Sequence, residues 1–286
     1  MSAEILKGAA VAAALNEGSR AICLTLREKG ISPCLAIVRV GERGDDIAYE
    51  RGILKRCSAL DVEAKQIILP ECVTQDEIIV IINDLNKDDN VHGILVFMPL
   101  PSHVDEAKVR ESIAPEKDVD GVTSGSAAFV YSGKGSGFAP CTARAVIEIL
   151  KYYNIPVASR RVAVFGRSMV IGKPVSMLLM EENATVTICH SRTFDGKEIA
   201  KQADIVVAAL GKAKALNGDY FREGQCVIDV GINFDEEGKM CGDVDFASAE
   251  AKVGYVTPVP GGVGAVTTAV LLRHTLESAE NMVTKK

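Results

Sequence analysis

The sequence predicts an α/β fold with two domains, of which the second contains a doubly wound parallel sheet. Short apolar runs typical of buried strands alternate along the chain with segments of helical periodicity. The chain has 286 residues, which is long enough for two domains of ordinary size. Hydrophobic residues make up 48% of the chain and charged residues 24%, so we expect a substantial core and an ordinary polar surface.

The first half of the chain alternates as parallel strands joined by helices would. We expect helices over residues 2–29, 47–60, 74–86 and 104–113. We expect strands over residues 34–40, 64–69 and 93–97. Thr74 and Glu77 have the spacing of a capping box at the start of the third helix. Residues 114–140 are rich in Gly and Ser and predict a long loop, which is either functional or a domain boundary.

The second half begins with a helix over residues 142–153 and continues with the same alternation. We expect strands over residues 162–165, 184–189, 205–209, 226–230 and 254–257. We expect helices over residues 174–180, 199–202 and 267–281. The predicted domains are therefore residues 1–145, on which a C-terminal helix at 266–286 packs back, and residues 146–265.

Charge, hydropathy and cysteine content exclude several classes of protein. A net charge of −6 argues against a general nucleic-acid binder, which needs clustered Lys and Arg. No apolar run approaches the roughly 20 residues that span a bilayer. The N-terminal segment contains Glu4 and Glu17 and is typical of a helix rather than a signal peptide. The eight cysteines are scattered without CxxC or metal-ligand spacing, so we expect mostly buried, reduced thiols, no metal and a cytoplasmic protein.

The segment from Arg161 to Arg192 is the most informative part of the chain. An apolar run is followed by a turn between Gly166 and Gly172, then by a helical pattern that includes Pro174, and then by a second apolar run. The two glycines are separated by five residues, so the turn alone is a weak signal. Its position between a strand and a helix predicts a dinucleotide-binding unit with a diphosphate at the turn.

The second strand of this unit ends at Cys189 and is followed by His190, Ser191 and Arg192, where many dinucleotide-binding units place an acidic residue. Together with Arg167 in the turn, these residues form a cationic corner rich in hydrogen-bond donors. Guanidinium groups match phosphate oxygens, so the pattern favours the 2′-phosphate of NADP over NAD. The alternative is that Arg167 and Arg192 are only solvated surface charges.

A set of motifs in order resembles the methylenetetrahydrofolate dehydrogenase/cyclohydrolase family over nearly the whole chain. Its most specific members are PEKDVDG at residues 115–121 and TPVPGGVG at residues 257–264. The others are Arg39-Val40-Gly41 with Tyr49, residues 93–96 with Pro99-Leu100-Pro101, Pro140-Cys141-Thr142, residues 166–168 with 172–174, residues 229–233 and residues 242–244. The resemblance implies an N-terminal catalytic domain, a C-terminal Rossmann domain, a cleft between them and a homodimer.

The resemblance implies hydride transfer from the methylene bridge of 5,10-methylenetetrahydrofolate to a nicotinamide, without need of a strong base. Tyr49 and Asp120 resemble the family residues beside the reacting carbon and on the pterin. The remaining residues that the resemblance places at the folate are Phe97, Pro99, Leu100, Pro260, Gly261, Gly262 and Gly264. Those that it places at the cofactor, beside His190, Ser191 and Arg192 of the cationic corner, are Thr142, Gly166, Arg167, Ser168, Gly172, Pro174, Gly231 and Ile232.

Each of these residues also has a structural interpretation. The glycines at 261–264 suit a turn before the last helix. Asp120 suits a solvated loop or a helix cap, and Tyr49 suits a core position. Cys141 has no histidine near it in sequence and is expected to be packed rather than nucleophilic. We assign His103 and His190 no role beyond cofactor contact.

Two departures from the family bear on activity. Bifunctional members have a lysine four positions after the tyrosine, where this chain has Ile53, and a glutamine where it has Phe97. In the family, these residues serve the cyclohydrolase step, in which water attacks the methenyl carbon. Ile and Phe can neither transfer protons nor form side-chain hydrogen bonds. Lys55 lies about 200° around the helix from position 53, so it is expected to face elsewhere.

The sequence therefore predicts a dehydrogenase with weak or absent cyclohydrolase activity. One alternative is a bifunctional enzyme in which Lys55 or a water chain replaces the missing lysine. Others are a folate- or nucleotide-binding regulator without turnover, an unrelated Rossmann dehydrogenase, and use of NAD, which some single-activity relatives prefer. Smaller departures from the family, which affect the charge near the pocket and the hinge, are Asp46, Ala143, Ala145 and Ala265.

Overall fold

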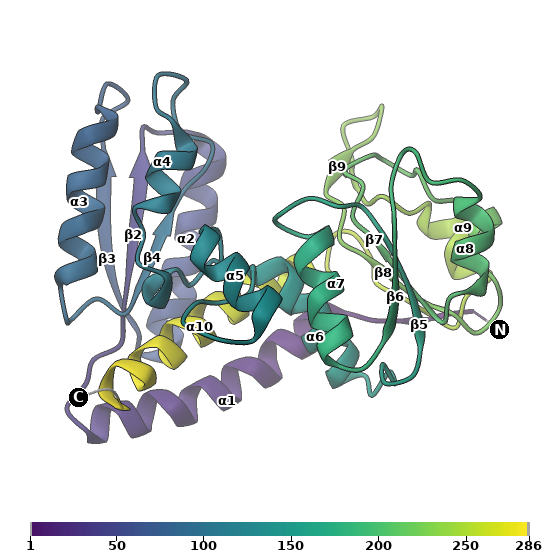
Figure 1. Ribbon diagram of the computed structural model, residues 1–286, viewed down its shortest axis with the longest axis horizontal. Helices are drawn as coiled ribbons and strands as arrows, with labels where there is room; N and C mark the ends of the chain where they lie inside the picture. The colour runs from purple at the N-terminus through teal and green to yellow at the C-terminus, as the bar shows by residue number, and fades with distance from the viewer. Residues whose placement is uncertain (1, 285–286) are drawn as a thin grey trace. The chain divides into compact units, whose positions relative to one another are not determined.

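The computed structural model describes residues 2–284 and shows two compact α/β units (Figure 1). The three-stranded unit contains Ala14–Ala139 and the residues from Thr268 onward. The six-stranded unit contains the residues up to Ala13 and Pro140–Thr267. The predicted α/β class is confirmed, and the domain boundary expected after residue 145 falls within helix α6 (Cys141–Tyr152).

The three-stranded unit has a parallel sheet in the order β3-β2-β4, with β2 (Cys34–Val40) fully buried in the middle. Its outer strands are β3 (Glu63–Leu69) and β4 (Gly93–Val96). Alternate residues of β2, such as Ala36 and Val38, pack with helices α3 (Gln75–Lys87) and α4 (Glu106–Glu111). The opposite face meets α2 (Gly44–Leu60), because Arg39 of β2 pairs with Glu50 of that helix at 2.8 Å.

Helices at the two ends of the chain contain two of the three points where the chain passes from one unit to the other. They are α1 (Gly8–Glu28) and α10 (Gly264–Thr284). Within the three-stranded unit, α10 is fixed to the segment around residue 118: the His274 ring and Val119 O are 2.9 Å apart, and Ser278 donates to Glu116 O at 2.7 Å. The end of the chain thus completes a unit that is built mainly from the first half.

The six-stranded unit has a parallel sheet in the order β1-β11-β8-β7-β5-β6. The strands are β1 (Glu4–Ile5), β5 (Arg161–Phe165), β6 (Thr185–Cys189), β7 (Ile205–Ala208), β8 (Cys226–Asp229) and β11 (Tyr255–Val256). Strand β5 pairs with β6 on one side and with β7 on the other, so the strand order changes direction between β5 and β7. In open parallel sheets, ligands bind outside the carboxyl ends of the strands at such a switch point.

Shorter elements surround this sheet. They are α6, α7 (Gly172–Glu181), α8 (Gly196–Gln202), the 3₁₀ helix η2 (Gly218–Tyr220), the hairpin β9 (Asn233–Phe234) with β10 (Met240–Cys241), and α9 (Phe246–Glu250). In the core, Phe221, Val206 and Val227 are almost fully buried. The eight cysteines are free, and Cys72 is the exposed one, so the prediction of mostly buried thiols is confirmed.

Sequence periodicity predicted most of these elements, and the capping box is confirmed: Thr74 Oγ1 accepts from Glu77 N, and the Glu77 side chain accepts from Thr74 N. Two predictions were wrong. The first helix starts at Gly8 instead of residue 2, because Glu4 and Ile5 pair with β11, which lies some 250 residues away in sequence. Such a partner is invisible to local pattern analysis.

The expected long loop at 114–140 was also wrong, because it contains the 3₁₀ helix η1 (Pro115–Lys117) and helix α5 (Ser124–Ser132). Thr123 caps α5 by accepting from Ser126 N at 3.1 Å. The Asp118 carboxylate accepts from the backbone N–H groups of Val122 and Thr123. Small polar residues suggested a loop, but two side-chain caps allow a short helix to form there.

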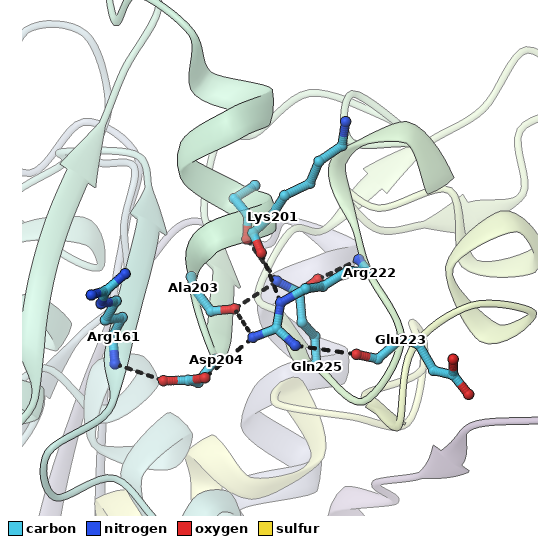
Figure 2. A network of polar contacts seen from close by, with 8 residues as sticks. Arg161, Lys201, Ala203, Asp204, Arg222, Glu223 and Gln225 are labelled. Atoms are coloured by element: carbon cyan, nitrogen blue, oxygen red, sulfur yellow. Dashed lines mark hydrogen bonds and ion pairs between the residues drawn. The ribbon is translucent and has the colours of Figure 1, made fainter.

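Figure 2 shows how side chains close the six-stranded unit near the amino ends of its strands. Arg222 donates to Lys201 O at 2.8 Å and to Ala203 O at 3.0 Å, at the end of α8. The buried Gln225 donates to Ala200 O and Ala203 O, both at 2.7 Å. Asp204 accepts from Arg161 N at 3.0 Å and pairs with Arg222 at 3.2 Å. We call Asp204, Arg222 and Gln225 the amino-end network.

Candidate active site

The glycine turn after β5 is packed so closely that neither of its two glycines has room for a side chain. Gly166 has a φ of +129°, and a Cβ on it would lie 2.0 Å from Ala209 O. A Cβ on Gly172 would lie 2.3 Å from Gly166 O. Both residues are therefore required for the start of α7 to approach the ends of β5 and β7. This brings the positive end of a helix to the switch point of the sheet.

Ser168 shapes the same turn. Its Oγ accepts from Ile171 N at 3.1 Å and from Gly172 N at 3.4 Å, just where α7 begins. The first turn of α7 has no acidic residue, and Pro174 occupies its third position. The dipole of α7 favours negative charge at this terminus, which suits a phosphate group.

The predicted cationic residues lie at the ends of two neighbouring strands. Phe165 of β5 is in register with Cys189 of β6, and Gly166 N donates to Cys189 O at 2.9 Å. Arg167, Ser191 and Arg192 follow these strand ends and are exposed. Within residues 2–284, neither guanidinium group has an ion-pair or hydrogen-bond partner. Both are therefore available to an anionic ligand at this edge of the sheet.

His190 has a structural function in this region. Its Nδ1 accepts from Arg192 N at 3.2 Å, and its backbone N–H donates to Thr193 Oγ1 at 2.8 Å. Thr193 N in turn donates to His190 O at 2.8 Å. The histidine thus fixes the tight turn that carries Ser191 and Arg192, while contact of its ring with a cofactor stays a prediction.

On the other side of the switch point, two buried carboxylates join the loops that follow β7, β8 and β10. The Asp229 carboxylate accepts from Gly231 N at 2.9 Å, Asp243 N at 3.0 Å and Val244 N at 2.9 Å. The Asp243 carboxylate accepts from Lys212 N at 2.8 Å and Asn233 Nδ2 at 2.9 Å, as well as from the N–H groups of residues 210 and 211. We call Asp229 and Asp243 the carboxyl-end network.

Both aspartates belong to motifs of the resemblance, but the sequence patterns predicted no function for either. The available signal was a carboxylate as the last residue of a buried strand, at the edge where ligands bind in parallel sheets. Burial raises the pKa of Asp229 to about 6, and this effect outweighs the three backbone N–H groups that lower it. The nearby charge of Asp243 raises it further.

The backbone that these carboxylates hold carries two of the predicted cofactor residues. Gly231 is buried, and a Cβ on it would lie 2.4 Å from Asp243 Oδ1. The next residue, Ile232, exposes 64% of its surface. A predicted contact of Ile232 with the nicotinamide is consistent with this exposure. Thr142, also assigned to the cofactor, lies in the first turn of α6, which packs on α7.

The glycine-rich turn before α10 is explained largely by its own packing. A Cβ on Gly262 would lie 2.4 Å from Pro258 O, and a Cβ on Gly8 would lie 2.1 Å from Gly262 O. Gly261 has a φ of +100° and open space around it. Pro260 and Gly264 are exposed. The turn therefore needs glycine even without a ligand, and its contact with folate stays a prediction.

In the three-stranded unit, the ring of Tyr49 lies against that of Phe97, and Ile53 is on the same helix as Tyr49. Tyr49 and Ile53 lie one turn apart on α2. The Tyr49 ring, 46% exposed, lies 5.5 Å from the ring of Phe97, which is 6% exposed and follows β4. Ile53 is fully buried. An exposed phenol ring therefore lies on an apolar floor, while Lys55 is exposed elsewhere on the helix.

A buried ion pair fixes the helix that carries Tyr49. One oxygen of the Glu50 carboxylate accepts from Arg39 Nε at 2.8 Å, and the other accepts from Gln66 Nε2 at 2.9 Å. Nearby, Arg43 donates to the carbonyl of the exposed Pro99 at 3.2 Å. Leu100, by contrast, is 7% exposed and belongs to the hydrophobic core, so its assigned contact with folate competes with a structural function.

Asp120 follows three residues, 117–119, that are each held by hydrogen bonds. Lys117 is buried and donates to Leu85 O at 2.9 Å and Asp88 O at 2.8 Å, at the end of α3. Asp118 caps the backbone that leads into α5, as described above, and Val119 O contacts His274. Asp120 itself is half-buried. The PEKDVDG motif therefore forms a well-anchored loop in which Asp118 is buried, Asp120 is half-buried and Glu116 is exposed.

Two further observations concern what the described residues could bind. Within residues 2–284, no group of three or more His, Cys, Asp or Glu side chains is placed to hold a metal ion. None of the helices in the same range is both long and apolar enough to cross a membrane.

Two family models match this chain in sequence order. The tetrahydrofolate dehydrogenase/cyclohydrolase catalytic domain matches residues 6–120. The tetrahydrofolate dehydrogenase/cyclohydrolase NAD(P)-binding domain matches residues 140–283. Together they cover most of both structural units.

Individual proteins show the same likeness over their full lengths. The bifunctional protein FolD of Clostridium kluyveri is 50% identical over 277 residues, which are 97% of this chain and 98% of that protein. The structure of the bifunctional FolD of Campylobacter jejuni has a TM-score of 0.93 and 40% identity, over 98% of this chain and 99% of that one. The Trypanosoma brucei enzyme, solved with NADP and an inhibitor, has a TM-score of 0.90 and 35% identity, with 99% of each chain covered.

Proposed function

The chain belongs to the tetrahydrofolate dehydrogenase/cyclohydrolase family, and from this we propose that it oxidises 5,10-methylenetetrahydrofolate to 5,10-methenyltetrahydrofolate with NADP as hydride acceptor. The observation that carries the proposal is the match to both family domains, the catalytic one and the NAD(P)-binding one, in order along a single chain. A regulator that binds only folate or only a nucleotide would not need both.

In this proposal the protein acts mainly by positioning. The methenyl product is a cation stabilised by two nitrogens, so the hydride step needs orientation and exclusion of water more than a strong base. The Asp120 carboxylate accepts hydrogen bonds from the amino and ring N–H groups of the pterin. The ring of Tyr49 lies beside the reacting carbon. A bound NADP supplies the nicotinamide carbon that accepts the hydride.

The preference for NADP over NAD is supported by the free guanidinium groups of Arg167 and Arg192 at the ends of β5 and β6. A 2′-phosphate would match their donors, whereas a ribose diol would be better served by a carboxylate, which this corner lacks. The check is a comparison of kcat/KM for NADP and NAD. We expect the ratio to favour NADP and to fall at least tenfold in Arg192→Ala, whereas a preference for NAD would contradict the assignment.

Whether the same site also hydrolyses its product is a separate question with two candidate answers. The relatives favour a bifunctional enzyme, since the proteins of Clostridium kluyveri and Campylobacter jejuni are both named bifunctional. In this candidate, Lys55 or a chain of waters would move the protons. The comparisons support it better than they support a single activity.

The second candidate is a dehydrogenase with weak or absent cyclohydrolase activity, and two side chains favour it. Ile53 and Phe97 lie next to Tyr49 and are almost fully buried, so the floor beneath the phenol ring is apolar. Such a surface offers neither a proton carrier nor a hydrogen bond to the attacking water. It would instead protect the methenyl product.

One experiment separates the candidates. Purified protein is given 5,10-methenyltetrahydrofolate, and the loss of its absorbance is compared with the uncatalysed rate on the same sample that is assayed for NADP reduction. Rapid enzyme-dependent loss supports the bifunctional enzyme, and its disappearance in Lys55→Ala would identify the substitute lysine. An uncatalysed rate, raised by the double change Ile53→Lys with Phe97→Gln, supports the single activity.

One result would contradict the proposed oxidation of 5,10-methylenetetrahydrofolate. If NADP and folate raise the melting temperature of the protein but no NADPH forms, the chain is a binding protein without turnover.

We further propose, from the resemblance to the family, that the protein is a cytoplasmic homodimer. Sedimentation equilibrium at micromolar concentration tests the dimer directly.

A further inference from the structure

The carboxyl-end network is an energetically costly arrangement, because it buries two carboxylates. Asp229 is 3% exposed and Asp243 is fully buried, and the backbone N–H of Asp243 is a hydrogen-bond donor to the Asp229 carboxylate. Among the described residues no Lys, Arg or His pairs with either of them. Two buried carboxylates without a counter-ion cost free energy that apolar residues of the same volume would not.

What the two carboxylates achieve is to fix three loops with one set of bonds. Asp243 accepts from three consecutive N–H groups, those of Leu210, Gly211 and Lys212, in the loop that follows β7. It also accepts from the Asn233 amide, in the loop that follows β8. Asp229 holds the segment that follows β10 through the N–H groups of Asp243 and Val244.

Close packing leaves these loops no freedom. A Cβ on Gly242 would lie 1.9 Å from Asp229 Oδ2, and a Cβ on Gly231 would lie 2.4 Å from Asp243 Oδ1. Thr257 Oγ1 accepts from Asp229 N at 2.7 Å, so the backbone at the end of β8 is held from β11 as well. The outcome is a rigid frame from which the side chain of Ile232 projects into solvent.

The position of this frame indicates which part of the cofactor it meets. The phosphate-binding helix terminus and the free guanidinium groups lie at the ends of β5 and β6. The frame lies at the ends of β7 and β8, across the switch point. A dinucleotide bound across a switch point with its adenosine end over β5 and β6 has its other end over β7 and β8.

We propose that Asp229 and Asp243 are positioning residues for the nicotinamide end of the cofactor, acting through the backbone of residues 210–212 and 231–232. This inference rests on the proposed function, because it assumes that a nicotinamide dinucleotide binds to the six-stranded unit. It goes beyond that function by dividing the cofactor site into two halves. The β5/β6 half holds the phosphates, and the carboxyl-end network orients the reacting ring.

The test compares binding of a whole cofactor with that of a fragment. Dissociation constants of NADP and of adenosine 2′,5′-bisphosphate, which lacks the nicotinamide mononucleotide half, are measured by calorimetry. In Asp243→Asn an NH₂ group replaces an acceptor opposite backbone N–H groups, so we expect NADP binding to weaken at least tenfold. Binding of the bisphosphate should stay within twofold of the wild type, and the KM for folate should not change.

The matched control is Asp204→Asn, the same change in the amino-end network, for which we expect neither constant to move. If Asp243→Asn fails to fold, Asn233→Ala removes a single bond to Asp243, and we expect it to weaken NADP about threefold but not the bisphosphate. Thermal melts of each variant confirm that the protein measured is folded.

The possible outcomes separate the two proposals. Equal weakening of NADP and the bisphosphate would show a merely structural function for the network and overturn the inference while leaving the proposed function intact. The inference is also overturned if neither constant changes in a folded variant. If the wild-type protein binds neither compound, the proposed function itself fails, and this inference fails with it.

Discussion

At the amino and the carboxyl ends of its strands, the six-stranded sheet satisfies backbone polar groups with side chains of opposite hydrogen-bonding type. At the amino ends of the strands, Arg222 and Gln225 are donors that satisfy backbone carbonyls at the end of α8. At the carboxyl ends, Asp229 and Asp243 are acceptors that satisfy backbone N–H groups of three loops. The first network lies next to solvent and contains an ion pair, and the second is buried and contains two like charges.

The difference shows where this domain accepts a cost in stability. A partly exposed guanidinium beside a carboxylate costs little, and capping a helix end is favourable. Burying two carboxylates is unfavourable unless hydrogen bonds or a counter-ion compensate for their desolvation. The costly network lies at the carboxyl ends of the strands, where cofactors bind in parallel sheets. This position supports the view that the amino ends maintain the fold and the carboxyl ends form the site.

The largest expected effect comes from placing a methyl group inside the carboxyl-end network. In Gly242→Ala the new Cβ would lie 1.9 Å from Asp229 Oδ2, so the loop must move. We expect the free energy of unfolding to fall by about 3 kcal/mol, together with loss of NADP binding. Chemical denaturation measures the change. Gly196→Ala is the control, because its Cβ would meet only Phe165 at 3.5 Å; equal stability of the two variants would contradict the packing.

A pH titration of stability isolates the cost of the buried charge. The pKa of Asp229, about 6 in the folded protein, lies above its usual value of 3.8. The folded state therefore binds a proton more tightly than the unfolded state, and the free energy of unfolding falls as pH rises from about 4 to about 6. We expect a loss on the order of 2 kcal/mol over that range. The free energy of unfolding is measured against pH for the wild type and for Asp229→Asn, and the variant should show no such decline. Parallel pH profiles of the two proteins would refute the prediction.

Changing the amino-end network should lower stability without affecting the cofactor. Gln225→Leu removes the acceptor of Arg222 N and one of the two donors to Ala200 O, at a buried position. We expect a loss of about 1.5 kcal/mol in the free energy of unfolding and an unchanged dissociation constant for NADP. Denaturation and calorimetry on the same preparation give both values. A tenfold loss of NADP affinity would remove the contrast between the two edges.

The smallest effect is expected for the ion pair shown in Figure 2. Arg222 and Asp204 are 3.2 Å apart, and their side chains are 45% and 36% exposed. Surface pairs of this kind contribute less than about 1 kcal/mol. Asp204→Asn should therefore leave the melting temperature nearly unchanged and reduce its dependence on salt. A strong destabilisation would mean that Asp204 also holds Arg161 N in a way that an amide cannot replace.

Sequence patterns located much of the candidate site because its parts are local. The glycine turn, the cationic residues after β6 and the pair Tyr49 and Ile53 each depend on spacing within one strand, turn or helix. Helical spacing places Tyr49 and Ile53 on one face without knowledge of any other segment. The contact of Tyr49 with Phe97 is different, because it joins α2 to the end of β4.

What the sequence determined by itself was the order of most strands and helices, the capping box at Thr74 and the need for glycine at the nucleotide turn. These features follow from periodicity, from side chains within reach of their own backbone and from conformations that only glycine adopts easily. Tertiary structure alone decided that Glu4 and Ile5 form a strand and that Asp243 bonds to residues more than thirty positions away. Hydrogen bonds of that kind depend on which strand ends lie side by side, and no local pattern contains that information.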